Sequence, residues 1–297
     1  MSDQKSLALI GVGRWGKNLL REFDKVADIR YVYHRGDKEN SKWLKENYPD
    51  IKTADSYEKV LADPVIDAVV IATPIKTHHE LARLALLAGK HVFVEKPITD
   101  NIKKAQELVK LAAKKKMTLF VGHIFSYHPV LAKIKQLTRH EPLKHAGFVW
   151  NKWGTFNEEM VFNLMSHDVA TALDLFGSPS NIKTLENVGM VTDSDIIYAK
   201  LTFPKQRSCT IYINRASNTK NKTVTLVTAK NTYLWDNDQL FKLDKKTNSL
   251  KLVYKSTQTP LEIECAEFKR CIKTRKKPHT NGEFGIGVIR ILEKLKK

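Results

Sequence analysis

The chain has 297 residues, more than one hydrophobic core usually holds, and this length favours two domains. Its formal net charge of +18 would attract an anionic substrate, but the lysines are spread along the chain without a nucleic-acid-binding motif, so we expect a solvated surface and no nucleic-acid partner. There is no membrane-length apolar run, no signal-peptide pattern and no CxxC spacing among the three cysteines, which favours a cytoplasmic protein without membrane contacts, disulfides or bound metal.

Residues 1–123 alternate short apolar runs with helical patterns. The apolar runs predict five strands, at residues 7–13, 29–34, 65–73, 91–97 and 118–124, and the patterns between them predict helices at 16–26, 41–49, 78–90 and 101–116. Such alternation is typical of βαβ units and a parallel sheet. We therefore predict an α/β protein with an N-terminal, doubly wound Rossmann sheet in residues 1–123.

The pattern changes after residue 123. A long helix is predicted at 158–176, then runs of period-two alternation at 195–203, 208–217, 222–230, 231–236 and 249–255, and a last helix at 284–297. Alternating runs separated by turn residues indicate an antiparallel sheet with one solvated face. We predict that residues 124–297 form a second α/β domain around a large, open, mainly antiparallel sheet, with the last helix packing back on the first domain.

Three glycines, Gly11, Gly13 and Gly16, directly follow the first predicted strand and open the first predicted helix. In this context they serve a tight turn, the close approach of a pyrophosphate and helix-on-strand packing. The free N–H groups and the positive dipole end of the helix would bind the phosphates. The context favours a dinucleotide site, including Arg14 and Trp15, over a glycine-rich packing turn.

The end of the second predicted strand bears on the choice between NAD and NADP. An acidic residue there would hold the ribose 2′-hydroxyl of NAD, but the chain has His34 and Arg35, and the next acidic residue is Asp37. A guanidinium suits a 2′-phosphate, although it can equally stack on the adenine of either cofactor. We therefore expect NAD(P), with NADP slightly favoured.

Three further stretches carry a family resemblance. They are ATPIKTHHELARLALLAGKHVFVEKP at 72–97, FVGHIFSYHPVLAKIKQL at 120–137 and VFNLMSHDVATALDLFG at 161–177. Together with the glycine turn they resemble the glucose-fructose oxidoreductase / inositol dehydrogenase (Gfo/Idh/MocA) family, in particular its sugar and nucleotide-sugar dehydrogenases. The resemblance implies that residues 124–297 bind substrate and that their open sheet forms a homodimer or homotetramer.

The resemblance also implies roles for individual residues. Lys96 would contact the hydroxyl that is oxidised and Glu95 would lie near the nicotinamide ribose, while Pro97 is often cis in such enzymes. Thr73 and Pro74 would lie along the cofactor, with His78 closing the same loop. The substrate would be bound by the following four residues: His123, Tyr127, Asn163 and His167.

Physical arguments support two of these roles. Lys96 ends an apolar strand at the carboxyl edge of the predicted sheet, where desolvation and a nicotinamide cation would lower the pKa of the amine towards the range of a general base. Asn163 and His167 are four residues apart on a predicted helix and would share a face, so His167 could act as acid or base while Asn163 orients the substrate. Each residue alone has a simpler reading: Lys96 as a strand-end cap and His167 as an ordinary helix histidine.

The chain also departs from the family pattern. Asn163 replaces the usual aspartate of the Asp-x-x-x-His motif, and Ala170 and Ile75 stand where an acidic residue and an asparagine are often found. An amide cannot accept the proton that a carboxylate could. A catalytically impaired NAD(P)-binding regulator or subunit, and a biliverdin-reductase-like reductase, are therefore the alternatives to a sugar dehydrogenase.

Overall fold

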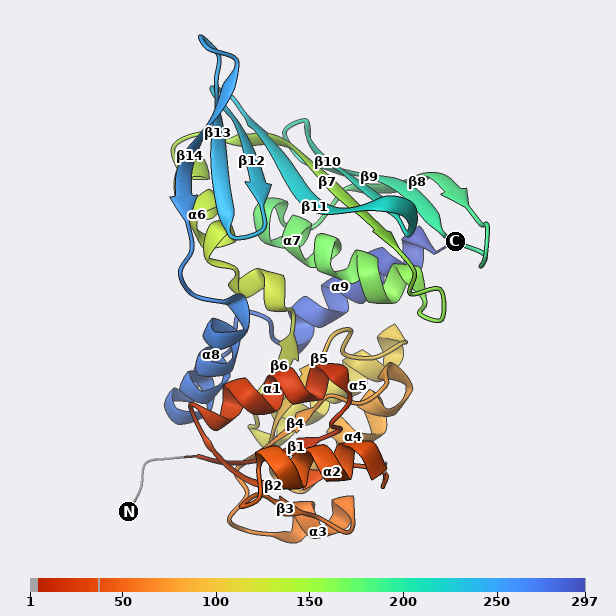
Figure 1. Ribbon diagram of the computed structural model, residues 1–297, viewed down its shortest axis with the longest axis vertical. Helices are drawn as coiled ribbons and strands as arrows, with labels where there is room; N and C mark the ends of the chain where they lie inside the picture. Colours follow the sequence, from red (N-terminus) through yellow and green to blue (C-terminus); the bar gives the residue numbers. More distant parts are fainter. Residues whose placement is uncertain (1–4, 37, 297) are drawn as a thin grey trace. The chain divides into compact units, whose positions relative to one another are not determined.

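The computed structural model describes residues 5–36 and 38–296 (Figure 1). These residues form two compact units. Unit 1 comprises the described part of Met1–His123 together with Leu261–Ile286, and unit 2 comprises Ile124–Pro260 with the described part of Gly287–Lys297. The chain therefore leaves the first unit, builds most of the second, and then returns to the first.

Unit 1 contains a six-stranded parallel sheet in the order β3-β2-β1-β4-β5-β6. The strands are β1 (Ser6–Ile10), β2 (Asp28–Tyr33), β3 (Lys52–Thr53), β4 (Ala68–Ile71), β5 (His91–Glu95) and β6 (Leu119–Gly122). The helices are α1 (Arg14–Asp24), α2 (Lys38–Asn47), α3 (Tyr57–Ala62), α4 (Ile75–Leu87), α5 (Ile102–Lys115) and the later α8 (Pro260–Thr274). The central strands β1 and β4 are buried along their whole length, as in parallel sheets covered on both faces. The Rossmann prediction is confirmed.

Four phenylalanines attach the returning helix α8 to this sheet. Phe23 of α1 lies edge-on to Phe93 of β5 with ring centroids 5.5 Å apart, and Phe93 stacks on Phe120 of β6 at 5.1 Å. Phe268 of α8 contacts these three rings at centroid distances of 5.9, 5.6 and 5.5 Å. All four rings are fully buried, so α8 completes a core that residues before 124 only begin.

Unit 2 contains an eight-stranded sheet in the order β14-β13-β12-β11-β7-β10-β9-β8. The strands are β7 (Leu143–Trp153), β8 (Asn181–Val188), β9 (Ile196–Phe203), β10 (Arg207–Asn214), β11 (Ala216–Thr228), β12 (Thr232–Asp236), β13 (Gln239–Asp244) and β14 (Ser249–Lys255). Its helices are a 3-10 turn (Ile124–Tyr127), α6 (Pro129–Thr138), a π-helix (Val161–Met165), α7 (Ser166–Phe176) and the later part of α9 (Gly282–Leu295). Among the described strands of this second sheet only β7 and β10 pair in parallel, so the mainly antiparallel sheet is confirmed.

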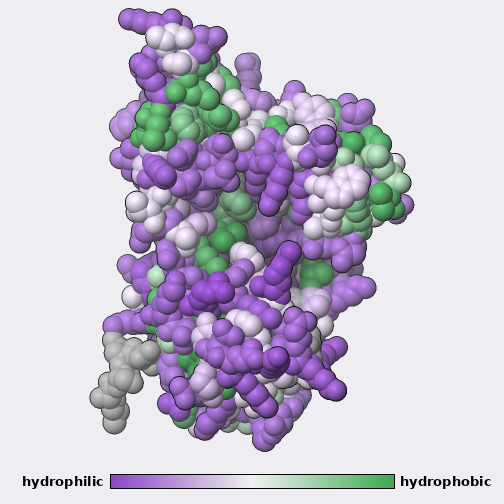
Figure 2. Space-filling model, in the orientation of Figure 1, coloured by the Kyte–Doolittle hydropathy of each residue, from purple (hydrophilic) through white to green (hydrophobic). Residues whose placement is uncertain are grey.

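One face of this sheet is buried and the other is open. On β11, Val224 and Leu226 are buried while Thr225 between them is exposed, and α7 packs on the buried face (Figure 1). Apolar side chains remain on the surface over β14, where Leu250 and Leu252 are about half exposed (Figure 2). Part of the open face is therefore apolar.

Several sequence predictions of local structure were incomplete. The strands β3, β7, β8 and β13 and the helices α3, α6 and α8 were not predicted. The helix expected at 158–176 begins later, as a π-helix at Val161–Met165 followed by α7, and the Glu158 carbonyl before it accepts a hydrogen bond from the Arg215 guanidinium. Strands such as the two-residue β3 are too short and too polar to show a period.

Candidate active site

The glycine turn of unit 1 has the geometry that a bound diphosphate needs. Gly11 adopts a φ of +97°, and a Cβ added to Gly16 would lie 2.1 Å from the carbonyl oxygen of Gly11, so both positions require glycine. A Cβ added to Gly13 would meet nothing within 4 Å. The turn therefore leaves open space at Gly13, where α1 begins without a side-chain cap, and its residues fit an NAD(P) diphosphate.

The ends of three neighbouring strands lie together at this edge of the sheet. Gly11 N donates to the carbonyl of Tyr33 at the end of β2 at 2.8 Å, and Ala72 N, after β4, donates to the carbonyl of Ile10 at 2.8 Å. The predicted cofactor residues that follow these strands are placed at the same edge. They are Arg14, Trp15, His34, Arg35, Thr73 and Pro74.

The residues after β2 leave the cofactor preference open. His34 is partly buried and its Nε2 lies 3.4 Å from Ser41 Oγ, while Arg35 is exposed. Asp37 lies outside the described residues. The exposed guanidinium can reach a 2′-phosphate or stack on a base.

His78 joins the loop after β4 to the segment after β5. Its Nε2 lies 2.7 Å from the Thr73 carbonyl oxygen and its Nδ1 lies 3.0 Å from that of Pro97. Burial lowers the pKa of His78, and a neutral imidazole donates only one hydrogen bond, so one of these two contacts is a hydrogen bond at a time. The histidine closes the loop and holds the segment that contains Lys96.

Glu95 is the last residue of β5 and contacts the residue Trp15 beside the glycine turn. Trp15 Nε1 donates to Glu95 Oε1 at 2.6 Å, and Lys96 N donates to Oε2 at 3.2 Å. Burial raises the pKa of Glu95 to about 7, outweighing the hydrogen bond from Trp15 and the charge of Lys96. Burial also raises the pKa of Glu264 on α8, and the charge of Glu95 adds to that shift. The glycine turn and the Glu95–Lys96 pair are thus joined by a direct contact.

Lys96 follows this buried carboxyl at the carboxyl end of β5 and is partly buried. Its peptide bond to Pro97 is cis, as the resemblance implied. His123, the last residue of the first stretch of unit 1, is buried with its ring edge-on to Phe284 at a centroid distance of 5.4 Å. Lys96 is therefore the more accessible of these two side chains for proton exchange.

The other predicted substrate residues belong to unit 2. Asn163 lies in the π-helix, where its Nδ2 donates to Glu158 Oε2, and His167 lies in the first turn of α7. The His167 ring lies 5.2 Å from the Phe125 ring and 5.9 Å from the Trp150 ring, measured between centroids. Tyr127 is partly buried in the 3-10 turn. Asn163 and His167 are both partly buried, and π-helices of one turn are frequent at functional sites.

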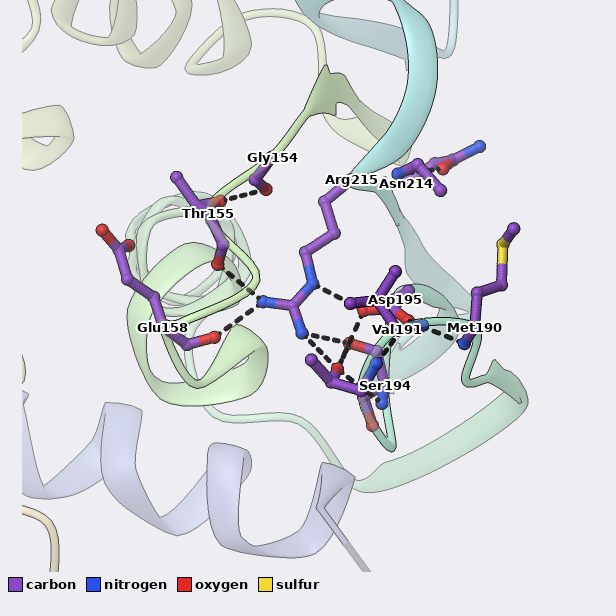
Figure 3. A network of polar contacts seen from close by, with 11 residues as sticks. Gly154, Thr155, Glu158, Met190, Val191, Ser194, Asp195, Asn214 and Arg215 are labelled. Carbon is purple, nitrogen blue, oxygen red and sulfur yellow. Dashed lines mark hydrogen bonds and ion pairs between the residues drawn. The ribbon is translucent and has the colours of Figure 1, made fainter.

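Arg215, at the junction of β10 and β11, holds the segment that leads into this π-helix. Its guanidinium lies between two loops in Figure 3, where it donates to the carbonyls of Thr155 and Glu158 at 2.9 and 2.6 Å. It also pairs with Asp195 at 2.9 Å. The sequence analysis did not identify Arg215, and only its position at a strand end distinguishes it from other arginines.

A second residue that the sequence analysis missed is Lys222 of β11. Its Nζ lies 3.2 Å from Asp168 Oδ1 of α7, and 3.8 and 3.9 Å from the ring centroids of Phe125 and Trp150. Lys222 precedes Val224 and Leu226 at the same two-residue spacing, so its side chain points to the buried face of the sheet. A lysine at such a core position was the signal in the sequence that could have identified it.

Residues 5–36 and 38–296 show neither a metal site nor a membrane-spanning helix. No group of three or more histidine, cysteine, aspartate or glutamate side chains there could hold a metal ion. In the same part of the chain, none of the helices has the length and apolar character needed to cross a bilayer.

Comparison with known proteins adds to this geometry. Residues 5–123 match the model of an oxidoreductase family with an NAD-binding Rossmann fold. The chain is 28% identical over 200 residues to UDP-N-acetylglucosamine 3-dehydrogenase of Acidithiobacillus ferrooxidans, covering 65% of this chain and 62% of that protein. It is 26% identical over 153 residues to scyllo-inositol 2-dehydrogenase (NADP(+)) of Bacillus subtilis, covering 47% and 43%. These matches span less than two thirds of either relative.

The fold extends over the whole chain. The solved structure of the Acidithiobacillus ferrooxidans enzyme superposes with a TM-score of 0.90 at 21% sequence identity, covering 99% of this chain and 97% of that one. At this identity the superposition establishes the common fold of both units, and the activity has to be argued from the side chains.

Proposed function

We propose that the chain, whose residues 5–123 match the model of an oxidoreductase family with an NAD-binding Rossmann fold, is an NAD(P)-dependent oxidoreductase of the Gfo/Idh/MocA family. Its substrate is a sugar or nucleotide-sugar in which a carbinol carbon is oxidised to a carbonyl, or the corresponding carbonyl carbon is reduced to a carbinol. The observation that carries the proposal is the 2.6 Å hydrogen bond between Trp15 and Glu95. This bond brings the glycine turn and the strand end that presents Lys96 to one edge of the sheet.

The proposed roles divide the chemistry among a few side chains. The bound nicotinamide supplies the hydride chemistry. Lys96 takes or relays the proton of the substrate hydroxyl from its position after the carboxyl end of β5. His167 exchanges a proton with the substrate or hydrogen-bonds a neighbouring hydroxyl. Asn163, Tyr127 and His123 position the substrate.

The experiment is a spectrophotometric screen for NAD(P)H formation. The panel contains UDP-N-acetylglucosamine, scyllo-inositol, D-glucose and D-glucose 6-phosphate, chosen from the relatives' names and from the positive charge of the chain. For an accepted substrate, Lys96→Ala should lower kcat by about 100-fold or more, the usual contribution of general acid–base catalysis. Lys103→Ala, an exposed lysine of α5, is the control and should leave kcat unchanged. Equal turnover by Lys96→Ala and the parent would refute the assigned role.

The cofactor proposal is that NADP binds more tightly than NAD. It rests on Arg35, exposed after β2, where an acidic residue would otherwise hold the 2′-hydroxyl. Arg35→Ala should reduce the ratio of NADP to NAD affinity by about 10-fold, as expected for one lost charge-assisted contact to phosphate. Fluorescence titration with NADPH and NADH measures the ratio, and an unchanged ratio would mean that Arg35 only covers the adenine.

A second candidate function is an NAD(P)-binding regulator without turnover. The amide of Asn163 stands where a carboxylate is usual and is engaged with Glu158. This candidate predicts that NADPH binds while no sugar of the panel is oxidised and no isotope exchanges into the cofactor. If the protein is such a regulator, the Asn163→Asp variant should gain activity. If the parent protein is already an active enzyme, the same variant should have equal or lower activity.

We also propose that the protein forms a homodimer or homotetramer through the open face of the sheet of unit 2. The half-exposed apolar residues of β14 support this proposal. Light scattering tests it, and Leu252→Glu should shift the distribution towards monomer.

A further inference from the structure

A cavity of about 290 Å³ lies within unit 2, on the buried side of its sheet. Residues from β11, β12, α7 and the segment around Phe125 line it. Its volume is close to the lower limit of about 300 Å³ for small-molecule pockets. A single ring-sized ligand is therefore the appropriate occupant.

The polar wall of the cavity is the ion pair between Asp168 and Lys222. Both side chains line the cavity, and their charged atoms are buried. Within the described part of the chain, neither Asp168 Oδ2 nor Lys222 Nζ has a hydrogen-bond partner, although the two groups attract each other as ions. A buried polar group without a hydrogen-bond partner is destabilising, so the wall favours a ligand that can both donate and accept.

The other walls of the cavity are aromatic. Trp235 of β12 lies with its ring centroid 4.8 Å from that of His128 and 6.3 Å from that of Phe125. Aromatic faces beside a few convergent polar groups are typical of small-molecule sites. Such walls can pack against the C–H faces of a ligand ring, and the Asp168–Lys222 pair can form hydrogen bonds with the hydroxyl groups of that ring.

The charges around the cavity do not favour an anion. Burial lowers the pKa of His128 to about 4, so its imidazole is neutral at pH 7. The charges of Lys222 and Asp168 cancel, and Asp238 adds a carboxylate to the lining. A phosphate in this cavity would meet no net positive charge, in contrast to the strongly positive chain as a whole.

We propose that this cavity binds the uncharged, polyhydroxylated ring of the substrate sugar, with Asp168 accepting a hydrogen bond from one ring hydroxyl and Lys222 donating to its neighbour. A hydroxyl group can serve both partners, and two adjacent hydroxyls match an aspartate and a lysine 3.2 Å apart. The inference rests on the proposed function, because it names the part of the substrate that unit 2 recognises.

The cavity is connected to the predicted catalytic histidine through shared aromatic contacts. Phe125 lines the cavity and lies 5.2 Å from His167 between ring centroids, and the same Phe125 ring lies below the Lys222 amine. A sugar ring held by Asp168 and Lys222 would therefore be bound next to His167. Lys222 and Asp168 are substrate-positioning residues in this arrangement.

The test measures sugar binding and cofactor binding separately. D-glucose, D-xylose and myo-inositol serve as uncharged probes and D-glucose 6-phosphate as the anionic one, each titrated by calorimetry against the NADPH-loaded full chain. We expect Asp168→Asn and Lys222→Met to weaken binding of the uncharged probes by about 10- to 100-fold, the usual effect of losing a hydrogen bond to a charged group. Affinity for NADPH should stay unchanged, and D-glucose 6-phosphate should bind more weakly than D-glucose.

A matched lysine–aspartate pair, whose aspartate lies on the same helix α7, is the control. Lys135 Nζ lies 2.8 Å from Asp174 Oδ1 of α7, and Asp174 is as buried as Asp168, but neither residue lines the cavity. Asp174→Asn and Lys135→Met should leave sugar affinity unchanged. If these variants lose as much sugar affinity as the cavity variants, the effect is a general disturbance of α7 and the inference is wrong.

The outcomes separate this inference from the proposed function. If the uncharged probes bind but no sugar is oxidised, the cavity inference holds and the oxidoreductase proposal fails. If a sugar is oxidised with the same KM by the parent and by both cavity variants, the function holds and the cavity inference fails. If no uncharged probe binds to the NADPH-loaded parent, the cavity holds only water and the inference is overturned.

Discussion

Unit 2 buries two ion pairs that differ in how completely they are hydrogen-bonded. In the Arg215–Asp195 pair, the five N–H groups of the guanidinium all have acceptors, and both side chains are at most 2% exposed. In the Lys222–Asp168 pair, one carboxylate oxygen has no hydrogen-bond partner among the residues described. The protein therefore satisfies all the hydrogen bonds of the Arg215 guanidinium, whereas the Lys222–Asp168 pair can still form hydrogen bonds with a ligand.

The same difference is expressed in the two carboxyl groups. Burial alone would raise the pKa of Asp195, but hydrogen bonds from the backbone N–H groups of Thr192, Met190 and Val191 outweigh it and lower the pKa. Burial raises the pKa of Asp168, and the opposing effect of Lys222 is smaller. The Asp195 carboxylate is thus stabilised by hydrogen-bond donors of the protein, whereas the Asp168 carboxylate, which faces the cavity, can accept a hydrogen bond from a ligand.

The largest effect that tests this comparison is on stability. Arg215→Met should lower the free energy of unfolding by about 3–5 kcal/mol, because it leaves Asp195 buried without its charged partner. Urea unfolding measures the change, and Arg290→Met, an exposed arginine of α9, should stay within about 0.5 kcal/mol of the parent. A loss below about 1 kcal/mol would mean that Arg215 does not hold the loops of unit 2 together.

A second prediction extends the comparison to Glu95 in unit 1, a buried carboxyl whose pKa is raised from 4.5 to about 7. The folded state therefore binds a proton that the unfolded state releases between these two values, so stability should fall as the pH rises through about 4.5 to 7. Glu95→Gln should remove about 3 kcal/mol of this decline in the cofactor-free protein. Exposed Glu58→Gln is the control, and an identical decline in Glu95→Gln would argue against a raised pKa.

The smallest effect on stability is expected for the pair that faces the cavity. The double variant Asp168→Asn with Lys222→Met removes both buried charges together, and such replacements are often neutral or stabilising. We expect the free energy of unfolding to stay within about 1 kcal/mol of the parent or to rise. A loss like that of Arg215→Met would show that both pairs are structural and would remove the contrast between them.

The sequence predicted the parts of the molecule whose chemistry is local. The glycines at positions 11, 13 and 16 follow a strand and open a helix within a few residues, so their context could be interpreted without the fold. The position of Lys96 just after a buried strand was predicted in the same way, whereas the cis bond before Pro97 was implied by the family resemblance. Alternation of apolar runs and helical patterns was sufficient to predict the parallel sheet.

The parts that were missed depend on register and on partners distant in the chain. Lys222 reaches Asp168 only because β11 lies beside β7 with one particular pairing, and no local pattern specifies that pairing. The hydrogen bond from Arg215 to the Glu158 carbonyl, just before the π-helix, joins residues 57 positions apart in the chain and has no local pattern either. The burial of Glu264 could not be anticipated either, because α8 was not predicted.

The fully buried Phe268 ring has a consequence for biogenesis. Its helix, α8, is synthesised after nearly all of unit 2, yet the ring belongs to the same apolar cluster as Phe23 and Phe93. On the ribosome, part of the interior of unit 1 stays exposed until more than a hundred later residues have emerged. During translation this unit therefore has the greater need for a chaperone, and a fragment ending at residue 123 should aggregate.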